Sequence, residues 1–164
     1  MASMRVDAER EFLDCFDATV TPVYGYTSRL IGDDPVHIER IVRDVYLDVL
    51  RRVRERSLVE IDVATLLADV RGRVLAQLRA VEPDDGVPRL AAAPARPVAS
   101  GSLTSRERVA LTLRFVDEMP AASVASTLDL SVRATDALVA KSRARLRARA
   151  ADPEDWLDEM LPAR

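Results

Sequence analysis

Hydrogen-bonding and cationic side chains gather in one stretch of the chain, SVRATDALVAKSRARLR, residues 131–147. Arg, Thr and Lys side chains near the start of an exposed helix can hydrogen-bond to base edges in the major groove, and cations further along attract phosphates. The stretch therefore predicts a DNA contact, in which Arg133, Thr135 and Lys141 read bases. The candidate DNA-binding residues are Arg133, Thr135, Asp136, Lys141, Arg143 and Arg145.

The same stretch also carries features that oppose base readout. Alanine occupies positions 134, 137, 140 and 144, and its side chain cannot hydrogen-bond. Asp136 can accept a hydrogen bond from cytosine, but it repels phosphate. The later arginines can instead pair with the acidic segment DPEDWLDEM that follows them. Phosphate contact and pairing with this segment both remain open interpretations of the basic cluster.

The residues before this stretch predict the other elements of a helix-turn-helix. An amphipathic helix is expected from about residue 103, with Leu103, Val109, Leu113 and Val116 facing a core. Pro120 opens a short helix, and Leu128-Asp129-Leu130 forms the turn, where Asp tolerates a left-handed backbone. Ser131 is expected to cap the last helix, which runs from Val132 to about Ala150.

The N-terminal part also has helical periodicity and almost no alternation typical of strands. One helical region ends near Ile31, a Gly-Asp-Asp-Pro turn follows, and further helices are expected over about 36–56 and 62–80. The second helix is apolar on more than one stripe, so we expect it to contact two neighbours. Its charges form i,i+4 pairs of opposite sign, such as Glu39 with Arg43 and Asp48 with Arg52.

These patterns predict an all-α protein with two small helical domains. Residues 82–102 contain four prolines and two glycines without an apolar period, which is typical of a linker. The expected boundaries are 1–81 for the first domain, 82–102 for the linker, 103–150 for the second domain and 151–164 for an acidic tail. The second domain has nine basic and five acidic residues, whereas the tail has one and five.

Composition argues against several other classes of protein. Five scattered glycines cannot form a phosphate-binding loop, and His37 is the single histidine, so we expect no catalytic residue and no enzyme. With Cys15 as the single cysteine, we expect no bound metal and no cofactor. The apolar runs are too short to span a membrane, and the N-terminus lacks a signal-peptide core. The sequence therefore predicts a cytoplasmic protein without membrane insertion.

Two segments together resemble extracytoplasmic-function (ECF) sigma factors, a class of bacterial transcription initiation factor. IERIVRDVYLDVLRR is similar to the helix of sigma region two that docks on the polymerase clamp, and SRERVALTLRFVDEMPAASVASTLDLS is similar to sigma region four. The positions in register in the first segment are Glu39, Val42, Val45, Leu47, Val49, Arg51 and Arg52. Those in the second are Arg106, Leu113, Arg114, Phe115, Ala125, Leu128 and Leu130.

The resemblance implies a sigma region two-like helical bundle, a helix-turn-helix domain, and promoter-specific transcription initiation. It also implies core RNA polymerase and promoter DNA as partners, and an anti-sigma factor as an inhibitor. By this resemblance, the polymerase-binding residues are Glu39, Arg40, Arg43 and Tyr46.

Departures from the family pattern favour a second function. Arg40 and Arg43 replace an Asp and a Gln of the docking helix, and Leu50 replaces its terminal Trp. The SLVEID loop is acidic and apolar, whereas capture of an unstacked promoter base favours aromatic and basic groups. The alternative is a degenerate sigma-like regulatory protein that acts through protein contacts and recognises promoters poorly.

Overall fold

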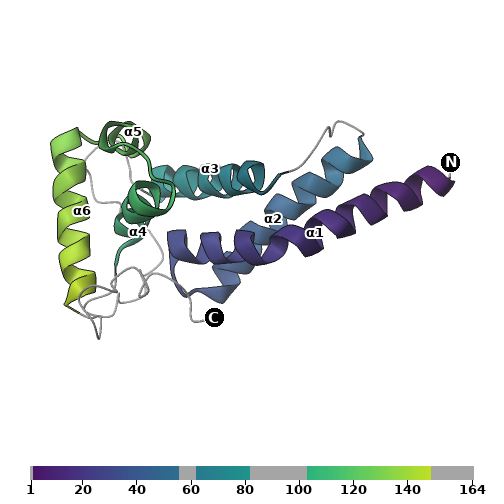
Figure 1. Cartoon of the computed structure of the whole chain (residues 1–164), viewed down its shortest axis with the longest axis horizontal. Helices are drawn as coiled ribbons and strands as arrows, with labels where there is room; N and C mark the ends of the chain where they lie inside the picture. Colours follow the sequence, from purple (N-terminus) through teal and green to yellow (C-terminus); the bar gives the residue numbers. More distant parts are fainter. Residues whose placement is uncertain (1, 56–61, 82–102, 149–164) are drawn as a thin grey trace. The chain divides into compact units, whose positions relative to one another are not determined.

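The computed structural model describes residues 2–55, 62–81 and 103–148, and every regular element within them is helical (Figure 1). This confirms the all-α prediction. The chain forms two compact units, Met1–Val74 and Leu75–Arg164. The division falls inside a helix, and the domain boundaries expected from the sequence stay a prediction. The expected linker 82–102 and the acidic tail after Ala150 lie outside the described residues.

The first unit starts with two long helices, α1 (Ala2–Ile31) and α2 (Pro35–Arg54), that pack against each other. The predicted turn lies between them. Gly32 adopts a φ of 92°, which costs little without a Cβ, and its N–H donates to the Ser28 carbonyl at 2.7 Å. Asp34 then caps α2 by accepting from the His37 N–H at 3.3 Å, and Pro35 occupies the first turn, where its missing N–H costs nothing.

The third helix, α3 (Val63–Val81), begins after Asp62, whose carboxylate accepts from the Thr65 N–H at 2.7 Å. Apolar residues from the first three helices form the core of the first unit. The fully buried ones among them are Val23, Leu30, Ile41, Val45, Val49, Leu66, Val70 and Val74. Among the described residues, no helix is long and apolar enough to cross a membrane.

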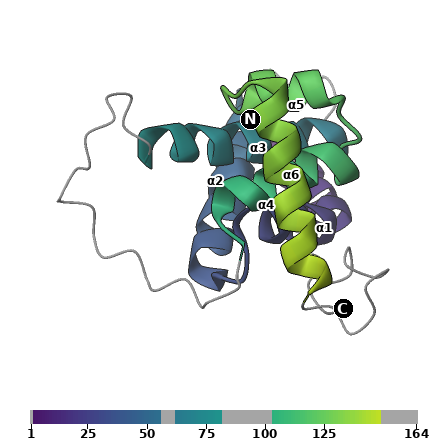
Figure 2. The same cartoon turned by 90° about the vertical axis from the view of Figure 1, so that its left-hand side faces the viewer.

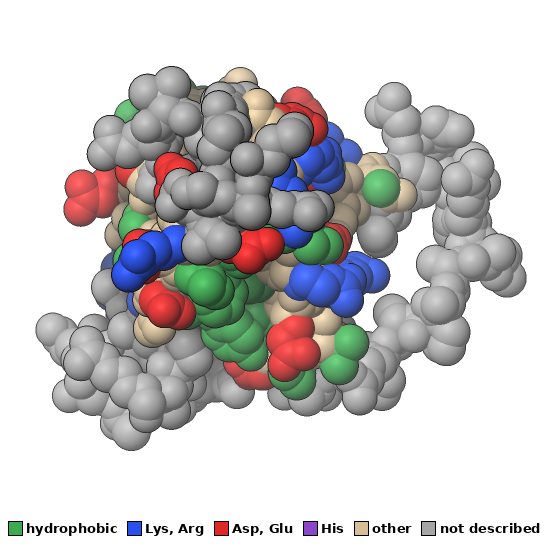
Figure 3. All heavy atoms as spheres, turned by 90° about the vertical axis from the view of Figure 1, so that its right-hand side faces the viewer, with side chains coloured by type: hydrophobic (Ala, Val, Ile, Leu, Met, Phe, Trp, Pro, Cys, Tyr) green, Lys and Arg blue, Asp and Glu red, His purple; other side chains and the backbone are tan. Residues whose placement is uncertain are grey.

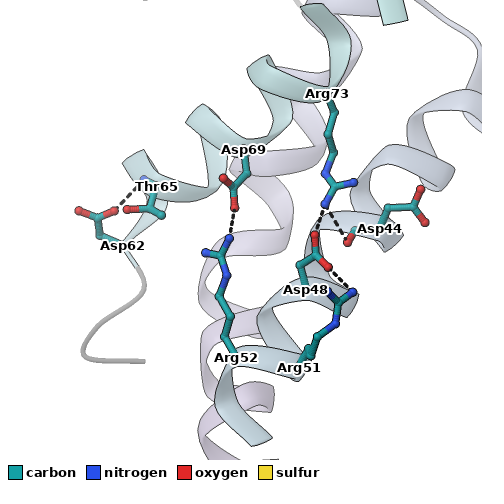
Figure 4. A network of polar contacts seen from close by, with 8 residues as sticks. All are labelled: Asp44, Asp48, Arg51, Arg52, Asp62, Thr65, Asp69 and Arg73. Atoms are coloured by element: carbon teal, nitrogen blue, oxygen red, sulfur yellow. Dashed lines mark hydrogen bonds and ion pairs between the residues drawn. The ribbon is translucent and has the colours of Figure 1, made fainter. Parts of the chain in front are cut away.

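Ion pairs join α2 to the part of α3 that lies in the first unit (Figure 4). Asp48 accepts from Arg51 at 2.6 Å and also pairs with Arg73, and Arg52 lies 3.5 Å from Asp69. Asp48 and Arg52, which were predicted to pair with each other, each form an ion pair with a residue of α3. The sequence of α2 does not reveal these partners, because α3 supplies them.

In the second unit, α4 (Ser105–Leu111) begins with a reciprocal cap. The Thr104 hydroxyl accepts from the Glu107 N–H at 3.2 Å, and the Glu107 carboxylate accepts from the Thr104 N–H at 2.8 Å. The π-helical segment η1 (Thr112–Val116) continues from α4, and the Asp117 N–H donates to the Thr112 carbonyl at 3.0 Å. A π-turn holds one more residue than an α-turn, so it rotates the side chains that follow.

Because of this rotation, one of the predicted core residues is not buried. Leu103, Val109 and Leu113 are buried as expected, but Val116 is 37% exposed. An uninterrupted α-helix would have brought Val116 to the same side as Val109 and Leu113.

The short helix α5 (Ala121–Thr127) follows Pro120, and α6 (Val132–Arg147) packs against both α4 and α5 (Figure 2).

Candidate nucleic-acid interface and docking groove

The connection between α5 and α6 has the geometry of a helix-turn-helix. Asp129 adopts a φ of 52°, which confirms the left-handed conformation predicted for it. The Leu130 N–H donates to the Ala125 carbonyl at 2.9 Å, and the Ser131 hydroxyl caps α6 by accepting from the Ala134 N–H at 3.1 Å. The start of α6 is therefore fixed by hydrogen bonds.

Arg106 of α4 reinforces this turn. Its Nη2 atom donates to the Leu128 carbonyl at 2.8 Å, so α4 holds the end of α5. Leu128 is buried, as are Val124 and Ala125. Arg106 thus has a structural part in presenting α6.

One side of α6 is exposed, and we call it the exposed face. Arg133 lies at its N-terminal end, Lys141 lies near its middle and Arg147 lies at its C-terminal end. The residues of this face are Arg133, Ala134, Asp136, Ala137, Ala140, Lys141, Ala144, Arg147 and Ala148. The face is therefore mainly small and weakly basic, with Asp136 as its single acidic residue. The structure leaves Arg133, Asp136 and Lys141 accessible for DNA contact.

Thr135 lies on the opposite side of α6, which corrects its predicted role. It is 1% exposed, and its hydroxyl donates to the Ser131 carbonyl at 3.1 Å. A side chain buried in this way cannot reach a base edge. Its position three residues before Leu138 and seven before Ser142 places it on the side of the helix that packs against α4 and α5.

Arg145 is also directed into the unit and not toward a phosphate. Its Nη1 atom lies 2.8 Å from Oε1 and 2.9 Å from Oε2 of Glu107, which is 3% exposed. The pKa of Glu107 lies below its ordinary value. Burial alone would raise this pKa, but the hydrogen bonds from Thr104 and Arg145 stabilise the carboxylate by more than burial destabilises it. The pair joins α4 to α6.

Arg143 is partly buried beside an aromatic ring. Its guanidinium carbon lies 5.3 Å from the centroid of Phe115, within the range of a cation–π contact. Phe115 and Val139 pack against the buried cluster of Leu103, Leu111 and Leu146. Arg143 and Arg145 therefore hold α6 in place. Among the described residues of α6, the exposed cations are Arg133, Lys141 and Arg147.

A groove with a volume of about 340 Å³ lies between α1 and α2 in the first unit. Its lining is mostly apolar, with one acidic and one basic residue. The lining residues are Phe12, Phe16, Val20, Tyr24, Glu39, Val42, Arg43, Tyr46 and Leu47. Leu47, one of these lining residues, is 51% exposed. Figure 3 shows hydrophobic side chains that reach the surface between charged ones.

Three of the predicted polymerase-binding residues line this groove. Glu39 and Arg43 are exposed, and the Arg43 guanidinium lies 3.6 Å from Asp44. Arg40 is exposed but does not line the groove. Tyr46 is 4% exposed, so it contributes very little to the surface.

The groove depends on an aromatic cluster that periodicity could not distinguish from an ordinary core. Phe16 and Tyr46 meet edge to face with centroids 4.8 Å apart, and Phe12 lies 6.5 Å from Tyr46. The Thr19 hydroxyl lies 2.7 Å from the Tyr46 hydroxyl and donates to the Cys15 carbonyl at 2.6 Å. Because Thr19 has a single hydroxyl proton, Tyr46 is the donor between the two hydroxyl groups.

Residues 99–146 match the family model described as Sigma-70, region 4, which spans α4, η1, α5 and most of α6. No curated protein matches the chain. The match supports a sigma factor-like role in transcription, with RNA polymerase and promoter DNA as the implied partners.

Proposed function

We propose that this chain is an ECF-type sigma factor that directs RNA polymerase to particular promoters. The observation that carries the proposal is the helix-turn-helix within the segment that matches Sigma-70 region 4, whose α6 presents Arg133 and Lys141 on an exposed face. Arg133 lies in the first turn of α6, where side chains reach base edges in the major groove. Lys141 lies about 12 Å further along the helix and suits a phosphate.

In this proposal the groove between α1 and α2 docks on core polymerase. An apolar groove with an exposed Leu47 and charges of both signs at Glu39 and Arg43 fits an amphipathic helix of a partner protein. Apolar contacts would supply most of the affinity, and the two charged residues would set orientation. An anti-sigma factor that covers either surface is a further expected partner.

A second function is favoured by one specific observation. Five of the nine residues on the exposed face of α6 are alanines, and Thr135 is buried, so few side chains are available for base readout. A sigma-like regulatory protein that acts through protein contacts, with little promoter recognition, accounts for such a face.

A pull-down with core RNA polymerase followed by transcription on genomic DNA fragments separates the two functions. A sigma factor binds the polymerase and produces transcripts with defined start sites, and the Arg133→Ala variant binds equally but initiates less. The regulatory protein binds the polymerase or another protein and yields no new start sites. Failure to bind polymerase at all would exclude the first function.

A further inference from the structure

The exposed face of α6 has two halves of different charge. Its N-terminal half carries Arg133 and Asp136, whose charges cancel. Its C-terminal half carries Lys141 and Arg147 without an acidic residue among the exposed positions. Between these two cations lies Ala144, and the small side chains let another chain segment approach the helix closely. The C-terminal half therefore fits an acidic and partly apolar segment.

The sequence supplies such a segment directly after α6. Residues 151–164 contain five acidic residues and one basic residue. Their apolar side chains recur at spacings typical of one side of a helix. The apolar residues are Trp156, Leu157, Met160 and Leu161. We infer that this segment docks on the C-terminal half of the exposed face of α6, with its acidic residues beside Lys141 and Arg147.

Chain length limits how far the segment reaches. It begins three residues after Ala148, so Arg147 and Lys141 are the nearest exposed cations on the face. Residues 153–161 would cover about 14 Å as a helix, whereas Arg133 lies about 21 Å along α6 from Arg147. The segment thus covers Lys141 and Arg147 and leaves Arg133 accessible. Attachment to the same chain gives it a high effective concentration at this site.

Docking there would reduce phosphate attraction by α6. This consequence rests on the proposed function, in which Lys141 contacts the DNA backbone. The segment would act as a weak internal competitor, strongest at low salt, since exposed ion pairs are weak and screened. Removal of residues 151–164 should then raise DNA affinity about three- to tenfold at low salt and less at high salt.

Trp156 is the only tryptophan in the chain, so its fluorescence reports docking without DNA. In the full-length protein we expect blue-shifted emission and protection from acrylamide. The double variant Lys141→Glu, Arg147→Glu should shift the Trp156 emission to that of an exposed indole. Adding Asp155→Arg and Asp158→Arg to this variant restores opposite charges across the contact, so it should restore protection from acrylamide. Arg133→Glu is the matched control on the same helix and should change nothing. Circular dichroism checks that each variant is folded.

The fluorescence result decides docking independently of DNA binding. Emission of an exposed indole in the unmodified chain would overturn the inference, and so would protection that the charge reversal at Lys141 and Arg147 leaves unchanged. DNA binding is measured separately by anisotropy with the full-length chain and with the chain ending at Ala150. If neither binds DNA while Trp156 responds as expected, the proposed function fails and docking stands.

Discussion

The guanidinium of Arg145 lies within 2.9 Å of both carboxylate oxygens of Glu107, and Glu107 also caps α4 through the Thr104 N–H. One buried acid therefore fixes the start of one helix and the position of another. Because Arg145 pairs with Glu107, we do not expect it to contact DNA. We expect its removal to lower the stability of the second unit.

Arg145→Ala should destabilise the second unit by about 1–3 kcal/mol, because it leaves a buried carboxylate without its cation. This loss of stability is smaller than the loss expected for a fully buried ion pair, because the Arg145 side chain is 33% exposed. Urea unfolding followed by circular dichroism measures it. Lys141→Ala is the matched control and should change stability by less than about 0.5 kcal/mol. Equal stability of the two variants would show that the pair contributes nothing.

Stability should depend on pH through Glu107. Its folded pKa lies below the ordinary value of 4.5, so its contribution is complete above that pH and is lost as pH falls through the folded pKa. Glu107→Gln should therefore be less stable than wild type at pH 7, and the difference should shrink below about pH 4.5. Urea unfolding at several pH values tests this. A constant difference across the range would contradict it.

Tyr46→Phe should lower the free energy of unfolding of the first unit by about 0.5–1.5 kcal/mol, because the Thr19 hydroxyl loses its donor. Burial raises the pKa of Tyr46 above 10.0, although the Thr19 hydrogen bond opposes the shift. Tyr24→Phe removes a phenol that is 36% exposed and serves as the control. Thermal unfolding should separate the two variants, and equal melting temperatures would argue against the hydroxyl contact.

Two exposed residues of α6 should contribute differently to DNA binding, Arg133 to sequence preference and Lys141 to phosphate attraction. Arg133→Ala should cost about 1–3 kcal/mol on a preferred promoter and little on random DNA, whereas Lys141→Ala should weaken both and reduce the salt dependence. Thr135→Val should leave sequence preference intact because Thr135 is buried. Fluorescence anisotropy at several salt concentrations distinguishes these outcomes. Loss of preference in the Thr135 variant, with the fold intact, would reverse its assignment as a structural residue.

The affinity for core polymerase should depend on the residues at the edge of the groove between α1 and α2. Arg43→Glu reverses an exposed charge at its edge and should weaken binding to core polymerase several-fold. Arg54→Glu makes the same charge change at the end of α2, outside the groove, and should bind like wild type. Gel-shift titration with core enzyme compares them. If both variants lose affinity equally, the groove is not the docking surface and only net charge matters.

The helix order and most helix ends could be predicted because local residues determine them. Gly32, Asp34, Asp129 and Ser131 each act through their own backbone or the next turn of the chain. The exposed face of α6 could not be predicted in the same way. Thr135 is buried because α6 packs against α4 and α5, and Arg145 is held by Glu107, which is 38 residues away in the chain. The groove likewise depends on how α1 and α2 pack.

The π-turn at Thr112–Val116 bears on how this unit tolerates changes in chain length during evolution. Because that turn already holds a surplus residue, losing one there would convert it to an ordinary turn and turn Val116 toward the interior. Losing one residue inside α6 would instead rotate everything after it by about 100° and bury the alanines. Single-residue deletions among homologues are therefore expected to collect at Thr112–Val116 and to spare α6.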